Sequence, residues 1–411
     1  MLEVSERIAS DDFAQIARHP DFPQAFTRSR KLPLPALIGA LLSMRNQSQQ
    51  VMLDGFFASV CGTESLLREV SDRAFAKARD RLYLPALTSL NDLVVRRADE
   101  ACLIERWCGL RVVAADASLL MPAVRPCLLS RSAAEPDQRL FALFLPGAEL
   151  TLHASVHSGL VAERSMLVEA LDLLGPDDVL VLDRGYPAAW LVALLNARGI
   201  RFVMRCDNDG GWSAAKAFLR SGAADASVTL NAPNADDVRD WGCPAGRPGL
   251  RLVRQAAPNG RVRVLATNLD AEHFHAALFG DLYHQRWRIE EAFKRLKHRL
   301  HLEAVSGLSQ QALIIDVAAK VLADNITSLM CAAAAQQGDL PARSRKCNRS
   351  YAAALMQRLL PRLVLLIGDV VSNIANAIHL LARTSQRFLR GRSQPRPAHH
   401  FKPHPSCAYK A

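Results

Sequence analysis

Hydrophobic residues in the N-terminal quarter of the chain recur at intervals of three and four, the spacing of one face of an α-helix. The pattern is clearest over residues 31–60 and again over residues 71–105. Ser71 followed by Asp72 is typical of a helix N-cap at the start of the second stretch. We therefore predict a helical N-terminal domain over residues 1–105.

From about residue 110 the pattern changes to short apolar runs, which are typical of buried strands. The runs LRVVAADAS and VLVLDRG contain an aspartate at or near their ends, Asp116 and Asp183. Further strand-like runs alternate with helix-like segments over the rest of this region. This alternation predicts a mixed α/β core. We expect this α/β core to form a domain over residues 106–305.

Residues at about 206–261 interrupt this alternation with many Gly, Pro, Asn and Asp residues. Because β-branched and apolar residues are also frequent there, we predict a β-rich insertion rather than a disordered linker. The sequence Pro258-Asn259-Gly260 is a hairpin signal within it. Helical periodicity returns afterwards and predicts a helical C-terminal region over residues 306–388. Residues 389–411 are rich in Pro, His and Arg and are expected to form a flexible basic tail.

The charge of the chain is concentrated near its C-terminus. The 411 residues include 51 basic and 40 acidic ones, for a net charge of +11. From residue 340 onward, 13 Lys or Arg oppose a single acid, Asp369, so this part carries +12 and the remainder −1. A basic extension of this kind fits a polyanionic partner such as nucleic acid, and equally fits a solvated tail.

The nine cysteines are scattered and include no CxxC pair, which argues against a disulfide framework and a zinc ribbon. The N-terminus does not resemble a signal peptide, and charged residues interrupt each of the most apolar stretches. We therefore expect a soluble, cytoplasmic protein with no membrane partner. The tail residues His399, His400, His404 and Cys407 have the composition of a zinc site but no folded frame around them.

Asp116 and Asp183 are placed where an α/β sheet collects its ligands, at the carboxyl ends of strands. For either aspartate alone, a solvated residue or a helix N-cap explains the position better than catalysis does. The segment YHQRWRIEEAFKRLKHRL predicts a continuous helix with an apolar face and a separate polar stripe. The stripe comprises Tyr283, Arg286, Glu290, Lys294 and Lys297. Spacing alone favours an exposed face on which Arg286 and Lys294 pair with Glu290.

Together, three carboxylates from two strand ends and one helix suit the binding of two divalent ions, Mg²⁺ or Mn²⁺, about 3.5–4 Å apart. Neither His nor Cys, which select softer metals, accompanies them. Arg286, Lys294 and Lys297 would then contact DNA phosphates on both sides of the cleaved bond, and Tyr283 would pack or hydrogen-bond near the terminal nucleotides.

Tyr283, Arg286, Glu290 and Lys297 follow the pattern Tyr-x₂-Arg-x₃-Glu-x₆-Lys. This pattern resembles the signature of bacterial cut-and-paste transposases of the insertion-sequence-4 group, within the DDE superfamily. The runs containing Asp116 and Asp183 resemble the two aspartate motifs of the same family. Similarity covers most of residues 20–330 and includes SDRAFAKARDRL and LEAVSGLS.

The resemblance implies a ribonuclease-H-like core with a β-rich insertion between the second aspartate and the glutamate. Asp116, Asp183 and Glu290 would be the catalytic, metal-binding triad. The N-terminal helical domain would bind the terminal inverted repeats, and a homodimer would act in the synaptic complex. The reaction would proceed through a nick, a hairpin on the transposon end and strand transfer to target DNA, in the bacterial cytoplasm and nucleoid.

Several side chains near these motifs have two readings. Hairpin formation in the group involves a base flipped onto an aromatic ring, for which Trp212 and Trp241 are candidates, although either can equally be a core residue. Arg184 would touch the DNA strand or remain solvated, and Trp287 is expected to pack in the core. Two alternative functions stay open: a ribonuclease-H-like nuclease or resolvase without strand transfer, and a catalytically silent DNA-binding regulator.

Overall fold

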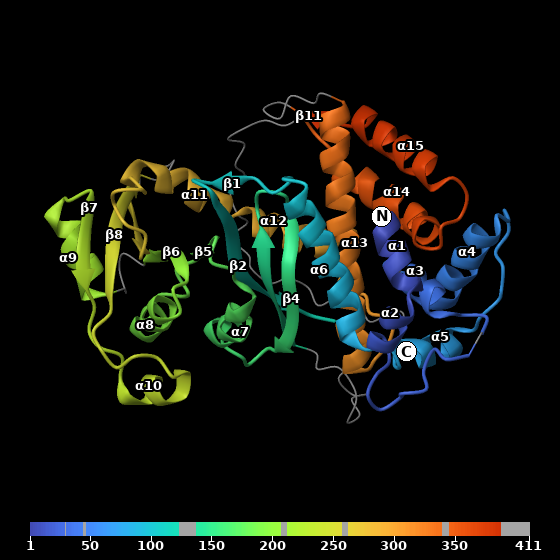
Figure 1. Cartoon of the computed structure of the whole chain (residues 1–411), viewed down its shortest axis with the longest axis horizontal. Coiled ribbons are helices and arrows are strands. Elements are labelled where there is room, and N and C mark those ends of the chain that lie inside the picture. The colour runs from blue at the N-terminus through green and yellow to red at the C-terminus, as the bar shows by residue number, and fades with distance from the viewer. Residues whose placement is uncertain are drawn as a thin grey trace. The chain divides into compact units, whose positions relative to one another are not determined.

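The computed structural model describes residues 1–28, 30–43, 47–122, 137–206, 212–256, 262–338 and 345–387 (Figure 1). The predicted hairpin at Pro258-Asn259-Gly260 and the basic tail at 389–411 lie outside these residues. The chain divides into two compact units. Unit 1 comprises Met1–Ala101, Leu119–Arg139 and Phe293–Ala411, and unit 2 comprises Cys102–Ser118 and Leu140–Ala292.

Unit 2 is built on a mixed sheet whose strands follow the order β4-β3-β2-β5-β6-β9-β8-β7, with β1 paired to β2. The strands are β1 Arg106–Trp107, β2 Leu110–Leu120, β3 Gln138–Leu145, β4 Leu150–Ser158, β5 Asp178–Leu182, β6 Arg201–Cys206, β7 Asp225–Thr229, β8 Gly249–Ala256 and β9 Val262–Thr267. β2, β5 and β6 run parallel, whereas β9, β8 and β7 continue from β6 in antiparallel pairs. Figure 1 shows β4 and β7 towards opposite ends of this sheet.

Parallel strands in the centre are apolar because both of their faces are covered. All five residues of β5 are buried, and its register sets Val112 opposite Val179 and Ala114 opposite Val181. The helices α7 Glu163–Ala170 and α8 Ala189–Ala197 precede and follow β5 in the chain. The mixed α/β sheet is consistent with a ribonuclease-H-like DDE domain.

The interval that the sequence marks as β-rich contains two strands, β7 and β8, and also two helices, α9 Ser213–Ser221 and α10 Ala235–Trp241. Its strands do not form a sheet of their own. β8 pairs with β9, which pairs with β6, so the interval lengthens the central sheet.

Unit 1 is helical and draws on both ends of the chain. Its helices are α1 Leu2–Ala9, α2 Asp11–Ile16, α3 Leu34–Ser43, α4 Gln49–Cys61, α5 Asp72–Arg79, α6 Leu84–Glu100, α13 Gln310–Gln337, α14 Arg349–Val364 and α15 Val370–Arg383, with a short β10 Arg345–Lys346 and β11 Gln386–Arg387 pair. One core joins Leu37 and Leu87 of the N-terminal helices to Leu322 and Leu360 of the C-terminal ones. Ser71 caps α5 as predicted, accepting a hydrogen bond from the Ala74 amide at 3.2 Å.

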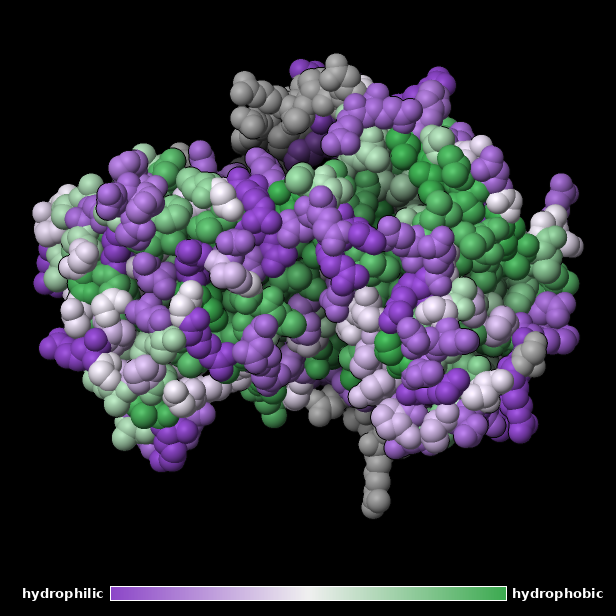
Figure 2. Space-filling view, viewed as in Figure 1, coloured by the Kyte–Doolittle hydropathy of each residue, from purple (hydrophilic) through white to green (hydrophobic). Residues whose placement is uncertain are grey.

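No helix in the described part of the chain is both long enough and apolar enough to cross a membrane. On the face shown in Figure 2, hydrophilic and hydrophobic residues are interspersed, with a larger hydrophobic area around α14 and α4.

Candidate active site

The three predicted carboxylates come from neighbouring parts of unit 2. Asp116 lies in β2, Asp183 follows β5 directly, and Glu290 lies in α12 Arg288–Lys294. Asp116 and Asp183 each lie two residues beyond the paired residues Ala114 and Val181 of adjacent parallel strands. The parallel register therefore brings both aspartates to the same edge of the sheet.

Arg286 holds the three carboxylates together. Its Nη1 donates to Asp116 Oδ2 at 3.4 Å, and its Nη2 donates to Glu290 Oε1 at 3.0 Å and lies 3.6 Å from Asp183 Oδ2. The Arg286 side chain is only 3% exposed, and its Nε has no hydrogen-bond partner among the residues that the structure describes. Arg286 does pair with Glu290, but the predicted solvated helix face is wrong for it, because the guanidinium is buried among three anions.

Tyr283 completes this cluster from α11 Phe279–Gln285. Its hydroxyl donates to Asp183 Oδ1 at 3.2 Å, and its ring lies 5.9 Å from the Arg286 guanidinium carbon. Burial and the nearby Asp183 charge raise the pKa of Tyr283. The phenol therefore stays protonated and acts as a fixed donor to Asp183.

The electrostatics of the cluster centre on Asp116. Burial raises the pKa of Asp116 to about 7, and the Arg286 charge opposes this rise. The pKa of Arg286 is itself raised: burial acts against the charged form, but Tyr283, Asp183, Asp116 and Glu290 outweigh burial. One buried cation thus balances carboxylates that would otherwise repel one another.

The predicted continuous helix over residues 283–300 is broken in the structure. α11 ends at Gln285, α12 covers Arg288–Lys294, and a π-helix follows at Arg295–Arg299. Both interruptions shift the phase of the side chains, so a single polar stripe with ideal α-helical spacing does not exist. The buried Arg286 side chain lies at the first break.

Lys294 and Lys297 lie in unit 1. Lys294 is exposed, as a phosphate contact requires. The Lys297 side chain is only 8% exposed. Its Nζ donates to the Leu119 carbonyl and lies 3.8 Å from Glu303 Oε1. Lys297 therefore has structural partners of its own.

Trp287 was expected in the core, and this expectation is wrong. Its side chain is 41% exposed, with the Arg263 guanidinium 5.5 Å from its ring and the His284 ring at 5.6 Å. This exposure could not be predicted from the sequence, because Trp287 lies in the break between α11 and α12, which the helical pattern does not show. Arg263 was not singled out either, since it lies about 20 residues before the motif.

The remaining candidates, Arg184, Trp212 and Trp241, lie at separate places in unit 2. Arg184 is exposed, and its amide donates to Asp183 Oδ1 at 2.7 Å. Trp241 stacks on Trp190 with ring centres 4.6 Å apart, whereas Trp212 is partly exposed at the start of α9. Beside Tyr283 lies a cavity of about 370 Å³ that Arg263 and His284 also line.

The donor set fits a hard divalent cation, although the described residues contain no group of three His, Cys, Asp or Glu side chains in metal-binding positions. The carboxylates of Asp116, Asp183 and Glu290 instead surround the Arg286 guanidinium. All three supply oxygen ligands of the kind that Mg²⁺ and Mn²⁺ prefer, and all three already gather around one positive charge.

Comparison with known families agrees with this geometry. Residues 131–326 match the model of the transposase DDE domain. The matched region contains Asp183 and Glu290 and begins after Asp116. No curated protein matches the chain. A match to this domain supports a DDE transposase, an enzyme of DNA recombination that depends on divalent metal ions.

Proposed function

We propose that this protein is a transposase of the insertion-sequence-4 group that cuts and joins DNA at the terminal inverted repeats of its element. The observation that carries the proposal is the convergence of Asp116, Asp183 and Glu290 on one buried cation, Arg286. Three carboxylates held this closely are unfavourable unless a cation is bound among them. Such an arrangement suits phosphoryl transfer assisted by metal ions.

Asp116, Asp183 and Glu290 would hold two Mg²⁺ or Mn²⁺ ions. When bound, these ions activate a water or hydroxyl and stabilise charge on the phosphate. Tyr283 fixes the orientation of Asp183 through its hydrogen bond. Arg286 keeps the carboxylates close together before DNA and metal bind.

The exposed residues around the carboxylates suit contact with the DNA strand. Arg184 follows Asp183 directly and Lys294 ends α12, and both side chains are exposed, as contact with backbone phosphates requires. Trp287, with Arg263 at its ring, offers a stacking surface for a base near the cleaved bond. Lys297 would act instead through its contacts with Glu303 and the Leu119 carbonyl, because its side chain is largely buried.

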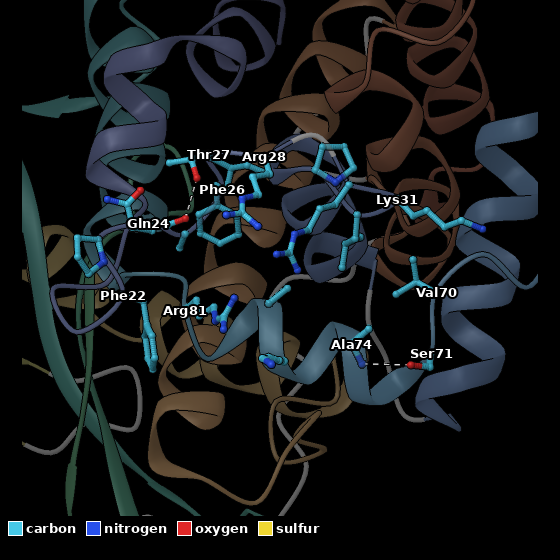
Figure 3. Close-up of a pocket in the computed structure, with 18 of the residues that line it drawn as sticks. Phe22, Gln24, Phe26, Thr27, Arg28, Lys31, Val70, Ser71, Ala74 and Arg81 are labelled. Atoms are coloured by element: carbon cyan, nitrogen blue, oxygen red, sulfur yellow. Dashed lines mark hydrogen bonds between the residues drawn. The ribbon is translucent and has the colours of Figure 1, made fainter.

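Recognition of the transposon ends is assigned to residues 1–105, and a basic cleft in unit 1 supports this assignment. The cleft has a volume of about 920 Å³. Its cationic lining residues are Arg28, Arg30, Lys31, Lys77 and Arg81, and its acidic ones are Asp21 and Glu69. In Figure 3, Arg28, Lys31 and Arg81 lie around the cavity with Phe22 and Phe26. An excess of cations around a groove favours contacts with DNA phosphates.

The remaining steps follow the family to which the sequence is similar. A homodimer would pair two element ends, nick them, form and reopen hairpin ends, and join these ends to target DNA. The reaction would take place in the bacterial cytoplasm, at the nucleoid.

The test is a cleavage and joining assay with MgCl₂ on duplexes that carry the inverted repeats flanking the gene. Asp116→Asn, Asp183→Asn and Glu290→Gln should each abolish nicking, hairpin formation and joining while leaving binding to the end intact. The matched control is Asp172→Asn, because Asp172 is an exposed carboxylate whose partner is Arg198.

Three results would contradict the proposal in different ways. Nicking without any joined product would indicate a nuclease or resolvase. Binding without nicking by the unaltered protein would indicate a silent regulator. A triad variant that cleaves at the normal rate would remove its residue from the site.

A further inference from the structure

Two sequence motifs whose roles the proposed function leaves open, SDRAFAKARDRL and LEAVSGLS, meet inside unit 1. Arg79 of the first motif donates from Nη1 to Ser306 Oγ of the second at 2.6 Å. Ser306 Oγ in turn donates to Asp316 Oδ1 of α13 at 2.7 Å. The Arg79 side chain is buried, so this contact is part of the interior.

The fit at this junction is tight. A Cβ atom placed on Gly307 would lie 2.4 Å from Arg79 Nη2 and 2.7 Å from the Ala312 Cβ. Any side chain at position 307 would therefore displace the Arg79 guanidinium. A second contact holds the same region, because Gln311 Nε2 donates to the Leu82 carbonyl at 2.8 Å.

Helix α5 presents different faces to the junction and to the basic cleft. Phe75 and Arg79, four residues apart, point inward and are buried. Ala74, Lys77 and Ala78 line the cleft instead. Figure 3 shows α5 along one side of this cavity, beginning at the hydrogen bond between Ser71 and Ala74. DNA bound in the cleft would thus touch the same helix that holds Ser306.

The other end of the junction is the segment 300–307, which we call the clamp segment. It follows the π-helix and begins ten residues after Glu290 in the chain. The buried Lys320 of α13 donates to the carbonyls of His301 at 2.8 Å and Ala304 at 2.7 Å, which fixes the path of this segment. Arg295 lies in the π-helix before the clamp segment and pairs with Asp324, which like Lys320 belongs to α13, at 3.2 Å.

The clamp segment also holds the end of the strand that carries Asp116. The Met121 amide donates to Glu303 Oε1 at 3.2 Å, and Lys297 joins Glu303 to the Leu119 carbonyl. Leu119 and Met121 are three and five residues beyond Asp116. The chain therefore runs towards the C-terminus from both Asp116 and Glu290 and reaches one set of polar contacts, in which Leu119 and Met121 meet Lys297 and Glu303.

We propose that Arg79 is a positioning residue for catalysis: it couples DNA bound in the basic cleft to the clamp segment, which sets the backbone leading to Asp116 and Glu290. This inference rests on the proposed function, because it assumes that the cleft binds the transposon end and that the carboxylates carry out cleavage. Its physical basis is that misplacing a catalytic group by about 1 Å can cost about 100-fold in rate.

The experiment compares Arg79→Gln with the unaltered protein in end binding, folding stability and single-turnover nicking at saturating DNA with MgCl₂. We expect end binding to stay within about twofold and nicking to fall by about 10- to 100-fold. Ser306→Ala, a smaller change at the other end of the contact, should likewise leave end binding nearly unchanged and slow nicking. Ser306→Thr keeps the hydroxyl and should therefore nick at the normal rate. The control is Arg68→Gln, which removes an arginine paired with Asp54 at 2.7 Å elsewhere in unit 1.

Coupling is measured with two duplexes, one carrying the whole inverted repeat and one truncated so that it keeps only the cleavage site. The unaltered protein should nick the whole repeat faster even when both duplexes are saturating, and Arg79→Gln should lose this difference. Normal nicking by both Arg79→Gln and Ser306→Ala, or the same loss in Arg68→Gln, would overturn the inference while leaving the proposed function intact. Absence of nicking by the unaltered protein would overturn both.

Discussion

Replacing Arg286 by methionine removes the cation that the three carboxylates share and keeps a side chain of moderate length. Asp116 lies 3.4 Å from Arg286 and is 20% exposed, so its charge would lose its partner in a poorly solvated place. Asp183 and Glu290 are 33% and 37% exposed, and water screens them in part. Because breaking a buried ion pair costs about 3–5 kcal/mol, we expect Arg286→Met to lose about 3 kcal/mol of unfolding free energy.

Urea unfolding with and without MgCl₂ is the appropriate assay. Without metal, Arg286→Met should show the whole loss of unfolding free energy. With MgCl₂ part of this free energy should return, because a bound ligand at 100 times its dissociation constant stabilises the folded state by about 2.7 kcal/mol. Arg184→Met, an exposed arginine beside Asp183, is the control and should change little. A loss below about 0.5 kcal/mol for Arg286→Met would refute the picture of a buried, shared cation.

Three further predictions test separate parts of the molecule. Trp287→Ala should weaken binding of single-stranded DNA by about 1–3 kcal/mol in an anisotropy titration, because base stacking on an aromatic ring contributes that much. An unchanged affinity would show that the DNA does not contact this ring. Lys77→Ala and Arg81→Ala should each make the slope of log K against log salt shallower by about 0.9 if each contacts one phosphate of the end duplex, and an unchanged slope would remove that residue from the interface. Burial, together with the nearby His157, lowers the pKa of His153 below its ordinary value of 6.5. The unfolded chain then binds more protons than the folded one near and below that pH, so stability present above it is lost as the pH falls. Melting temperatures should therefore drop more on acidification in the unaltered protein than in His153→Gln, and equal drops would contradict this linkage.

The strands that carry the aspartates could be predicted from sequence because their signal is local. A run such as VLVL, residues 179–182, is apolar at every position, as is typical of a strand covered on both faces, and Asp183 follows it directly. The Ser71 cap of α5 is equally local, since a hydroxyl and an amide three residues later are sufficient for it.

Contacts between distant segments could not be predicted in the same way. The polar stripe containing Arg286 and Glu290 fits a solvated helix, and only the fold shows that Asp116, 170 residues earlier, shares the same cation. The core that joins Leu37 to Leu322 could not be predicted from the sequence either. An apolar helix face shows that the helix packs against something, but not against which helix. For the same reason, the sequence describes two helical regions where the structure has one helical core.

The two breaks in the predicted helix around Glu290 illustrate how tertiary contacts override local preference. An uninterrupted α-helix would satisfy more backbone hydrogen bonds over residues 283–300, and the sequence contains neither Pro nor Gly there. The polar contacts on each side offset this cost. Arg286, at the first break, reaches three carboxylates, and Arg295, at the start of the π-helix, reaches the buried Asp324. A short helix held at both ends by buried arginines fixes Glu290 more firmly than local propensity alone would, as the catalytic role proposed for Glu290 requires.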